Sequence, residues 1–331
     1  IQRCVNGGRT MTANNEKQYI VDKLQDFDAV SLYPSAMSIM DGIPKGKPHV
    51  IPKNTTHQQL MQYDTFFIEI NITGIKCKSV KPYAFGQVFT KTDKKLYGNE
   101  PVNNYYVDKI TLLDLLEFYD IEYEFIRGYY FNEGFNREIN KFITKLFNLR
   151  LKYKKEHNPL EQTIKLLLNS IDGKSILKPM KEDIKVVDCD KLTSYLYRNY
   201  NFIKEITIED GSTHGYVKRI KPICHHFNSP QFGASVLSWS KHIMNQVMCT
   251  AEQHDIPIYY QDTDSMHLRE CDVPKLAKLY KTKYGKTLIG KNMGQFHCDF
   301  DSFEGSVGQI HSRKLIALGK KSYLDILFDE V

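Results

Sequence analysis

The 331-residue chain is 41% hydrophobic and 25% charged, with 19 Gly and 12 Pro, a composition that excludes disordered, collagen-like and coiled-coil proteins. It is long enough for at least two subdomains around a substantial core, and no apolar run approaches the ~20 residues of a membrane helix. The net charge of +6 is concentrated, because residues 141–181 carry ten Lys and Arg against three acids. Such a basic block indicates either a polyanionic partner or a solvated helical face.

The seven cysteines include no Cys-x-x-Cys pair, which favours free thiols in a reducing compartment over a zinc ribbon or an oxidised scaffold. The first residues lack both an initiator Met and a signal peptide. We therefore expect a soluble, intracellular protein without a membrane partner, and a fragment or processed product of a longer chain.

The first half of the chain is expected to mix strands and helices. Alternating aromatic and β-branched residues predict strands at 18–31 and 65–72, with a short helix between them that begins near Tyr33. A helix at 111–119 and a strand at 121–131 follow.

From Asn136 onward, apolar residues recur at helical spacing. Asn158-Pro159 is expected to end a first helix, and Gly173 to stop a second helix near Ser170, so that the two form an αα-hairpin carrying most of the basic block. Residues 180–227 are polar and irregular, and we interpret them as an inserted subdomain.

A long helix is predicted from about 233 to 254. The strands expected after it lie at 256–261, 264–268, 314–318 and 322–328. Because strands and helices do not alternate regularly, we predict an α+β fold with a helical protrusion, rather than a doubly wound fold.

The strongest local signal is Tyr260-Gln261-Asp262-Thr263-Asp264-Ser265, between two short apolar strands. A tight hairpin would hold two carboxylates at its tip, where their oxygens could bind a hard divalent cation such as Mg²⁺. Asp and Ser are also ordinary turn residues, and an Asp-x-Asp segment alone is more often a turn than a metal site.

A further acid, Asp28, stands at the end of the 18–31 strand, just before Ser31-Leu32-Tyr33. A compact strand-to-helix turn can project this carboxylate and nearby backbone N–H groups toward one bound anion. The alternative is an Asp that merely caps the following helix.

The predicted αα-hairpin offers four polar groups at helical spacing. Arg150 and Lys154 are four residues apart, as are Lys165 and Asn169, so each pair shares one face of its helix. If the helices pack antiparallel, the four groups converge on one groove that could hold phosphates. Exposed helical Lys and Arg are common, so this pattern gains meaning only beside the carboxylates.

These motifs, in this order, resemble those of the family B DNA polymerases. Asp28-x-x-Ser-Leu-Tyr-Pro-Ser is similar to motif A, Lys165-x-x-x-Asn169-Ser170-x-x-Gly173 to motif B, and Tyr260-x-Asp-Thr-Asp-Ser to motif C. Lys321-Ser322-Tyr323 resembles the Lys-x-Tyr motif that holds the primer strand. Val5-Asn6-Gly7-Gly8 resembles the Tyr-x-Gly-Gly motif between the exonuclease and polymerisation halves, with Val in place of Tyr.

The resemblance implies a right-hand polymerase: a palm made of an antiparallel sheet backed by helices, and a helical-hairpin fingers subdomain. The expected divisions are an N-terminal palm with motif A at 1–134, fingers with motif B at 135–175, and a palm with motif C and the start of a truncated thumb at 229–331. Inserted segments at about 76–110 and 176–228 favour the protein-primed viral and organellar branch, in which such insertions help contact a priming protein.

The implied function is that of a DNA-directed DNA polymerase. It would extend a primer or a terminal protein primer with dNTPs by two-metal-ion phosphoryl transfer, for replication of a viral, plasmid or mobile-element genome. The cofactor would be two Mg²⁺ ions, with Mn²⁺ as an alternative.

Residue by residue, the resemblance implies that Asp28 and Asp264 are catalytic and bind both ions directly, whereas the catalytic Asp262 lies farther from them. The dNTP would be bound by Ser31, Leu32, Tyr33, Arg150, Lys154, Lys165 and Asn169, with the Tyr33 ring excluding a 2′-hydroxyl or, alternatively, only packing the turn. Primer-template DNA would be contacted by Gly7, Gly8, Ser170, Gly173, Lys321 and Tyr323.

One position departs from the family pattern: Asp172 stands where motif B has Tyr. Asp offers no stacking face and adds negative charge, so we expect weaker nucleotide binding or lower fidelity than in an Asp172→Tyr variant. A catalytically impaired, polymerase-like nucleic-acid-binding protein therefore stays open as a second reading. A metal-dependent nuclease is disfavoured, because the residues before motif A are too few for an exonuclease domain.

Overall fold

The computed structural model describes residues 1–78, 91–92, 95–96, 101–177, 182–220, 228–302 and 309–330. The chain divides into a first compact unit, made of Ile1–Gly173 and Pro230–Val331, and a second, Lys174–Ser229. Every site residue expected from the sequence belongs to the first unit. Within the described ranges, no helix is long and apolar enough to cross a membrane.

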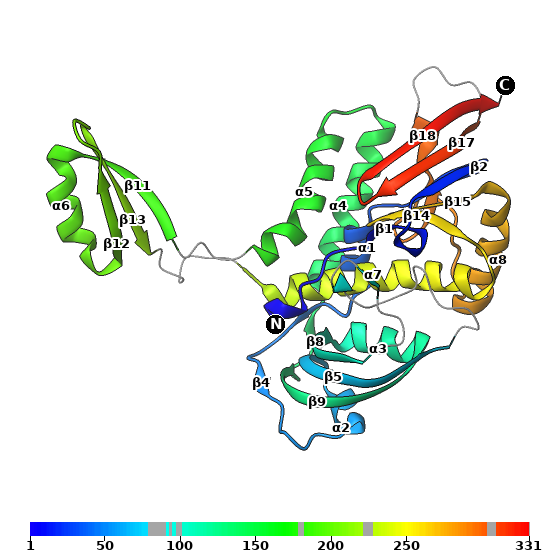
Figure 1. Ribbon diagram of the computed structural model, residues 1–331, viewed down its shortest axis with the longest axis horizontal. Helices are drawn as coiled ribbons and strands as arrows, with labels where there is room; N and C mark the ends of the chain where they lie inside the picture. Colours follow the sequence, from blue (N-terminus) through cyan, green and yellow to red (C-terminus); the bar gives the residue numbers. More distant parts are fainter. Residues whose placement is uncertain are drawn as a thin grey trace. The chain divides into compact units, whose positions relative to one another are not determined.

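An antiparallel sheet in the order β1-β14-β15-β2-β17-β18 forms the centre of the first unit, with β16 also paired to β2 (Figure 1). Its strands are β1 (Thr10–Thr12), β2 (Gln18–Ala29), β14 (Ile258–Asp262), β15 (Ser265–Arg269), β16 (Phe296–Cys298), β17 (Gln309–Gly319) and β18 (Ser322–Glu330). The side chains of β2 alternate: Phe27 and Ala29 are buried, whereas Asp26 and Asp28 lie on the other face. This period-2 pattern is what predicted the strand from the sequence.

The buried face of this sheet packs against helices. The helices of the first unit are α1 (Leu32–Ile39), α2 (His57–Gln62), α3 (Lys109–Phe118), α4 (Glu138–Lys155), α5 (Leu160–Ile176, which ends in the second unit), α7 (Pro230–Gln253) and α8 (Val273–Tyr284). One apolar cluster joins Phe27 and Met266 of the sheet to Val247 of α7 and to Ile143 of α4 and Ile164 of α5. The helical hairpin is therefore anchored in the same core as the strands that carry Asp28 and Asp264.

The predicted stop at Gly173 is wrong, because α5 continues to Ile176. Gly173 is exposed, and an added Cβ would meet no atom within 4 Å among the described residues. A helical glycine costs only about 1 kcal/mol relative to alanine, and the surrounding turns of α5 contribute buried side chains that outweigh it, including Leu168 and Ser175.

A further antiparallel sheet of the first unit has the strand order β4-β9-β5-β8. Its strands are β4 (His49–Val50), β5 (Thr65–Cys77), β8 (Val102–Asp108) and β9 (Tyr119–Phe131). Phe66, Ile68 and Ile70 of β5 pack with Leu112 and Leu115 of α3. The expected insertion at about 76–110 lies partly outside the described residues, which include its ends in β5 and β8.

Short elements complete the first unit: the 3-10 helices Gln2–Cys4, Ala13–Asn15, Glu270–Asp272 and Asp299–Ser302, and the strand pairs β3 (Ile43–Pro44) with β10 (Phe135–Asn136) and β6 (Lys91–Thr92) with β7 (Lys95–Leu96).

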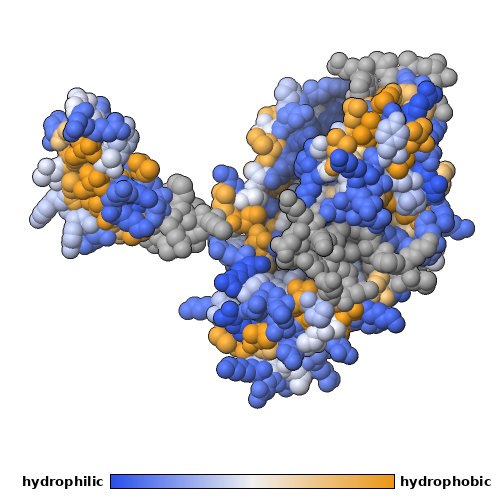
Figure 2. Space-filling view, in the orientation of Figure 1, coloured by the Kyte–Doolittle hydropathy of each residue, from blue (hydrophilic) through white to orange (hydrophobic). Residues whose placement is uncertain are grey.

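The second unit has regular structure, so the prediction of an irregular 180–227 segment is wrong. Its strands β11 (Glu182–Asp188), β12 (Ile203–Ile208) and β13 (His214–Ile220) form an antiparallel sheet in the order β11-β13-β12. The helix α6 (Cys189–Asn199) and the 3-10 helix Tyr200–Phe202 lie between β11 and β12 in the sequence. Charged residues interrupt the apolar pattern because they pair across strands, as Lys218 does with Glu182 at 3.2 Å. Hydrophobic residues gather over these strands in Figure 2. Ile184 and Val186 of β11 are among the exposed apolar side chains of this unit.

Candidate active site

Asp262 and Asp264 flank the tight turn that joins β14 to β15. Thr263, at the centre of the turn, has a left-handed backbone with φ 55°, and the N–H of Asp264 donates to the carbonyl of Asp262 at 2.6 Å. The turn is also held from β1, because the Thr263 N–H donates to the carbonyl of Arg9 at 2.7 Å. The predicted hairpin with carboxylates at its tip is therefore present.

Strand pairing brings Asp28 to this turn. Asp28 lies opposite Ser265 in the β2–β15 register, and the N–H of Ala29 donates to the carbonyl of Asp264 at 2.9 Å. Asp28 and Asp264 thus become neighbours although 236 positions separate them in the sequence.

Burial and neighbouring negative charges disfavour the ionisation of both carboxylates. Burial, and then the negative charge of Asp264, raises the pKa of Asp28 to about 8, with smaller contributions from Asp299 and Asp26. Burial together with the charges of Asp262 and Asp26 also raises the pKa of Asp264. A bound cation would relieve this repulsion, because an opposite charge favours the ionised form of each acid.

The donor set fits a hard divalent ion that shares its coordination with a substrate. In the described part of the chain, no group of three or more His, Cys, Asp or Glu side chains is arranged to hold a metal. Mg²⁺, however, typically needs only one or two carboxylates, because waters and substrate phosphates complete its octahedron. Asp28 and Asp264 are therefore sufficient protein ligands for such an ion.

Asp262 has a different environment from the other two acids. Its Oδ1 lies 2.5 Å from Nζ of Lys321 and accepts a hydrogen bond from Thr10 Oγ1 at 3.2 Å. Lys321 occupies the β17–β18 turn with φ 57°, and its N–H donates to the hydroxyl of Tyr260 at 3.0 Å. The ring of Tyr323 lies 4.6 Å from that of Tyr260. The structure thus brings the Lys-x-Tyr residues directly to the motif C strand.

Arg150 connects both hairpin helices to the strand-to-helix turn. Its Nη1 donates to Oγ of Ser31 at 3.0 Å, and its Nε donates to Oε1 of Glu161 on α5 at 2.7 Å. Ser31 has a left-handed backbone with φ 50° and precedes the buried Leu32 at the start of α1. Lys154, Lys165 and Asn169 are exposed, and their side chains form no hydrogen bond or ion pair among the described residues. Convergence of all four groups on one groove stays a prediction.

The charge of Asp172 acts on Tyr33. Burial, followed by the charges of Asp172 and then Asp264, raises the pKa of Tyr33, which packs against the main core. Asp172 is 5% exposed, and burial raises its pKa to about 6. The carboxylate at the atypical motif B position therefore lies near the predicted sugar-selecting tyrosine. Of the other motif B residues, Ser170 donates from Oγ to the carbonyl of Leu167 at 3.0 Å.

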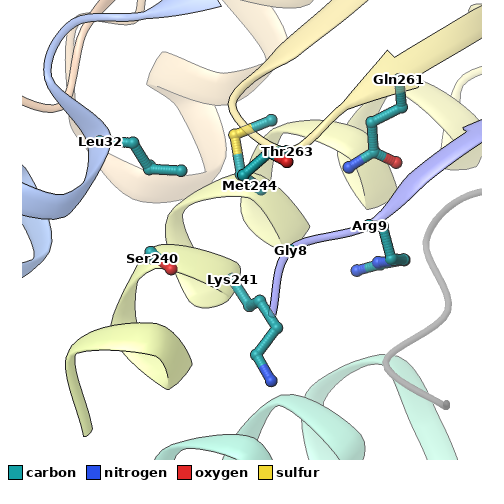
Figure 3. A pocket seen from close by; sticks show the side chains of 8 residues that line it. All are labelled: Gly8, Arg9, Leu32, Ser240, Lys241, Met244, Gln261 and Thr263. Carbon is teal, nitrogen blue, oxygen red and sulfur yellow. The ribbon is translucent and has the colours of Figure 1, made fainter. Parts of the chain in front are cut away.

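Sequence reasoning missed two cations beside the Gly7-Gly8 segment. A cavity of about 10 Å³ is lined by Gly8, Arg9, Lys241, Thr263 and four further residues, and Figure 3 shows the Gly8 backbone between Lys241 of α7 and Thr263. The Arg9 guanidinium donates to Oδ1 of Asn245, and burial lowers the pKa of Lys241. Two signals could have found them: Arg9 follows Gly-Gly directly, and Lys241 is the single Lys or Arg in the α7 sequence.

Known proteins resemble the chain along most of its length. A family model described as DNA polymerase type B, organellar and viral, matches residues 1–254. The DNA polymerases of Bacillus phages Nf and B103 are each 27% identical to the chain, over 286 and 288 residues, covering 84% of it but 44% of their own length. The chain therefore spans less than half of these curated relatives.

Among solved structures, Phi29 DNA polymerase complexed with primer-template DNA matches with a TM-score of 0.65 at 19% identity, covering 99% of this chain and 49% of that one. Its ternary complex with primer-template DNA and incoming nucleotide substrates gives 0.65 at 18% identity, covering 99% and 50%. These matches confirm the predicted α+β, right-hand fold.

A substitution at Gly8 tests whether the segment that leads into β1 holds the Thr263 turn in place. An alanine Cβ at Gly8 would lie 2.7 Å from Cγ2 and 3.2 Å from Cα of Thr263, so the turn itself must shift. We expect Gly8→Ala to lower the free energy of unfolding by about 1–3 kcal/mol, measured by thermal and urea denaturation. Gly7→Ala is the matched control, because no described atom lies within 4 Å of its Cβ. Equal stability of the two variants would contradict this account of the turn.

Proposed function

The chain belongs to the organellar and viral DNA polymerases of type B, and we propose that it carries the polymerisation site of a template-directed DNA polymerase. The observation that supports this most is the pairing of β2 with β15, which places Asp28 beside Asp264, together with Arg150 on the adjacent Ser31 turn. Phosphoryl transfer requires these parts: carboxylates for metal ions and cations for the triphosphate.

Asp28 and Asp264 would hold two Mg²⁺ ions, or Mn²⁺, which supply activation of the primer 3′-hydroxyl and neutralisation of the leaving pyrophosphate. Asp262 would contribute without direct metal contact, because its Oδ1 is engaged by Lys321. Burial and then the negative charge of Asp264 raise the pKa of Asp28 to about 8, and this supports the division, since metal binding would offset both effects.

The incoming dNTP would lie between the Ser31–Tyr33 turn and the helical hairpin. Arg150, Lys154 and Lys165 would bind its phosphates, with Asn169 on the same face as Lys165. Arg150 already reaches the turn, where it forms a hydrogen bond to Ser31. The Tyr33 ring would exclude a ribose 2′-hydroxyl. In this arrangement the fingers align the reactants, which is the largest part of the protein's contribution.

Primer-template DNA is the proposed macromolecular substrate. Lys321 and Tyr323 would hold the primer terminus beside motif C, and Gly7 and Gly8, together with Ser170 and Gly173, would contact the duplex. Arg9 and Lys241 add positive charge beside Gly8. We further propose that a terminal protein can serve as the primer, as expected for the viral and organellar branch, and that the chain acts in replication of a viral, plasmid or mobile-element genome inside a cell.

Primer extension tests the proposed function. Purified protein should extend a labelled primer on a DNA template with dNTPs and Mg²⁺, and EDTA should abolish extension. We expect Asp264→Ala and Asp28→Asn each to lower the rate at least about 1,000-fold, because each removes a metal ligand. Both variants should retain primer-template affinity, since neither removes a cation. Primer extension at the wild-type rate in both variants would contradict the proposed site.

The second candidate function, a nucleic-acid-binding protein with impaired catalysis, rests on Asp172. Its ionised carboxylate near Tyr33 would repel the triphosphate. We expect Asp172→Tyr to lower the KM for dNTP and raise the steady-state incorporation rate. Tight primer-template binding without extension in either protein would favour the second candidate, and equal incorporation by both would refute the role of Asp172.

The pH dependence separates charge from shape at this position. Asp172→Asn keeps the size of the side chain but stays neutral. Because the pKa of Asp172 is about 6, the KM for dNTP of the wild type should exceed that of the Asn variant by about three- to tenfold at pH 8, and the ratio should approach one below pH 6. The raised pKa also means that the wild type loses stability relative to the variant as pH rises from 3.8 through about 6. If the ratio of the two KM values does not change with pH, the shape of the Asp172 side chain and not its charge causes the difference.

A further inference from the structure

We propose that His267 is a positioning residue for the primer terminus, because it fastens the β17–β18 hairpin, which carries Lys321 and Tyr323, to the strands that carry Asp28 and Asp264. This inference rests on the proposed function, since it assumes that Lys321 and Tyr323 hold the primer. His267 follows motif C and has no part in the roles assigned above.

His267 joins three strands through its two ring nitrogens. Its Nε2 lies 2.8 Å from Oδ2 of Asp325 on β18, and its Nδ1 lies 3.7 Å from Oδ1 of Asp26 on β2, while His267 itself belongs to β15. The imidazole is 0% exposed, and the two carboxylate side chains are 8% and 13% exposed. The contact is therefore shielded from water, where a charge-assisted hydrogen bond is strongest.

The backbone ladder does not link these strands directly. In the sheet order β1-β14-β15-β2-β17-β18, both β2 and β17 stand between β15 and β18. Moreover, β17 pairs only with the first half of β2, from Gln18 to Leu24, whereas β15 pairs with the second half of β2, from Leu24 to Asp28. The curled sheet thus leaves the β18 end of the hairpin without strand pairing to motif C in the described structure, and the His267–Asp325 bond spans that distance.

The same face of β18 carries Tyr323. Tyr323 and Asp325 are two residues apart on a strand and therefore project to one side. The Tyr323 ring lies 4.6 Å from the ring of Tyr260 and 5.3 Å from that of His267, near perpendicular to the latter at 71°. Displacement of Asp325 from His267 would therefore move Tyr323 relative to motif C.

The local charges also favour this role. Burial works against a charged imidazolium, but the hydrogen bond that His267 donates to Asp325 and the negative charges of Asp26, Asp325 and Asp262 outweigh it and raise the pKa of His267. Besides these carboxylates, the groups packed around the imidazole are the rings of Tyr260, Tyr323 and Phe300. A cationic His267 would thus balance two otherwise buried acids, and its removal would release the hairpin.

The test separates positioning from simple stability. His267→Phe keeps an aromatic ring but removes both nitrogens, whereas His267→Gln keeps an N–H donor near the position of Nε2. His311→Phe is the matched control, because His311 is equally buried on β17 of the same hairpin, 3.1 Å from Glu270, but its nearest ring is Phe328 and not Tyr323. Each variant is measured for thermal stability, for primer-template Kd by fluorescence anisotropy, and for the KM of primer-template and of dNTP in single-nucleotide extension.

We expect His267→Phe to raise the Kd and KM for primer-template about tenfold while the KM for dNTP stays within about twofold, and His267→Gln to recover most of the loss. His311→Phe should lower the melting temperature without changing the Kd or either KM. If His267→Phe does not fold, Asp325→Asn serves instead, because it replaces the charge-assisted bond with a weaker neutral one. This variant should raise the Kd for primer-template threefold or more.

Two results would overturn the inference: a wild-type Kd and KM for primer-template in folded His267→Phe, or an equal change in His311→Phe. A wild-type chain that binds primer-template but never extends it would instead defeat the proposed function, and the Kd values would still decide the role of His267.

Discussion

The constraint on which the site depends is the enforced proximity of two like charges. Nothing in the preferences of Asp28 or Asp264 brings their carboxylates together, and their raised pKa values show that the arrangement costs free energy. The β2–β15 ladder, the bond from the Ala29 N–H to the Asp264 carbonyl, and the Thr263 turn held by Arg9 supply the restraint. In the proposed function a divalent cation would offset this cost, because an opposite charge favours the ionised form of each acid.

The sequence predicts those parts of this arrangement that depend on local patterns. The alternation in residues 18–31 predicts β2, with Asp28 near its end, and the Asp-Thr-Asp segment predicts the β14–β15 turn. Local patterns gave wrong predictions where contacts with distant parts of the chain outweigh an unfavourable local residue. Gly173 lies inside α5 because neighbouring turns are anchored in a core that the helix sequence does not reveal. The polar segments 182–188, 203–208 and 214–220 form strands, and charged side chains pair across their sheet.

Contacts between distant side chains were beyond the sequence for the same reason. The pairing of Asp262 with Lys321 joins residues 59 positions apart, and that of Arg150 with Ser31 joins residues 119 apart. Periodicity placed Arg150 and Lys154 on one helix face, yet only Arg150 has a recorded partner at the Ser31 turn in the described structure. Helical spacing determines which residues share a face, but the tilt of the helix against its neighbours determines which of them reaches a given group.

A polymerase site must align a primer terminus with metal ligands on other strands, and an error of about 1 Å can cost two orders of magnitude in rate. Backbone ladders hold adjacent strands to such tolerances, but the hairpin that bears Lys321 and Tyr323 is adjacent to β2 only far from Asp28. Side chains must therefore supply the alignment across the open part of the curled sheet. Lys321 contacts Asp262 and Tyr260 there, and His267 contacts Asp325. In the proposed function, the acids beside Asp28 and Asp264 would therefore contribute to the grip on DNA as well as to catalysis, and the pairing of Asp262 with a lysine of the hairpin agrees with this role.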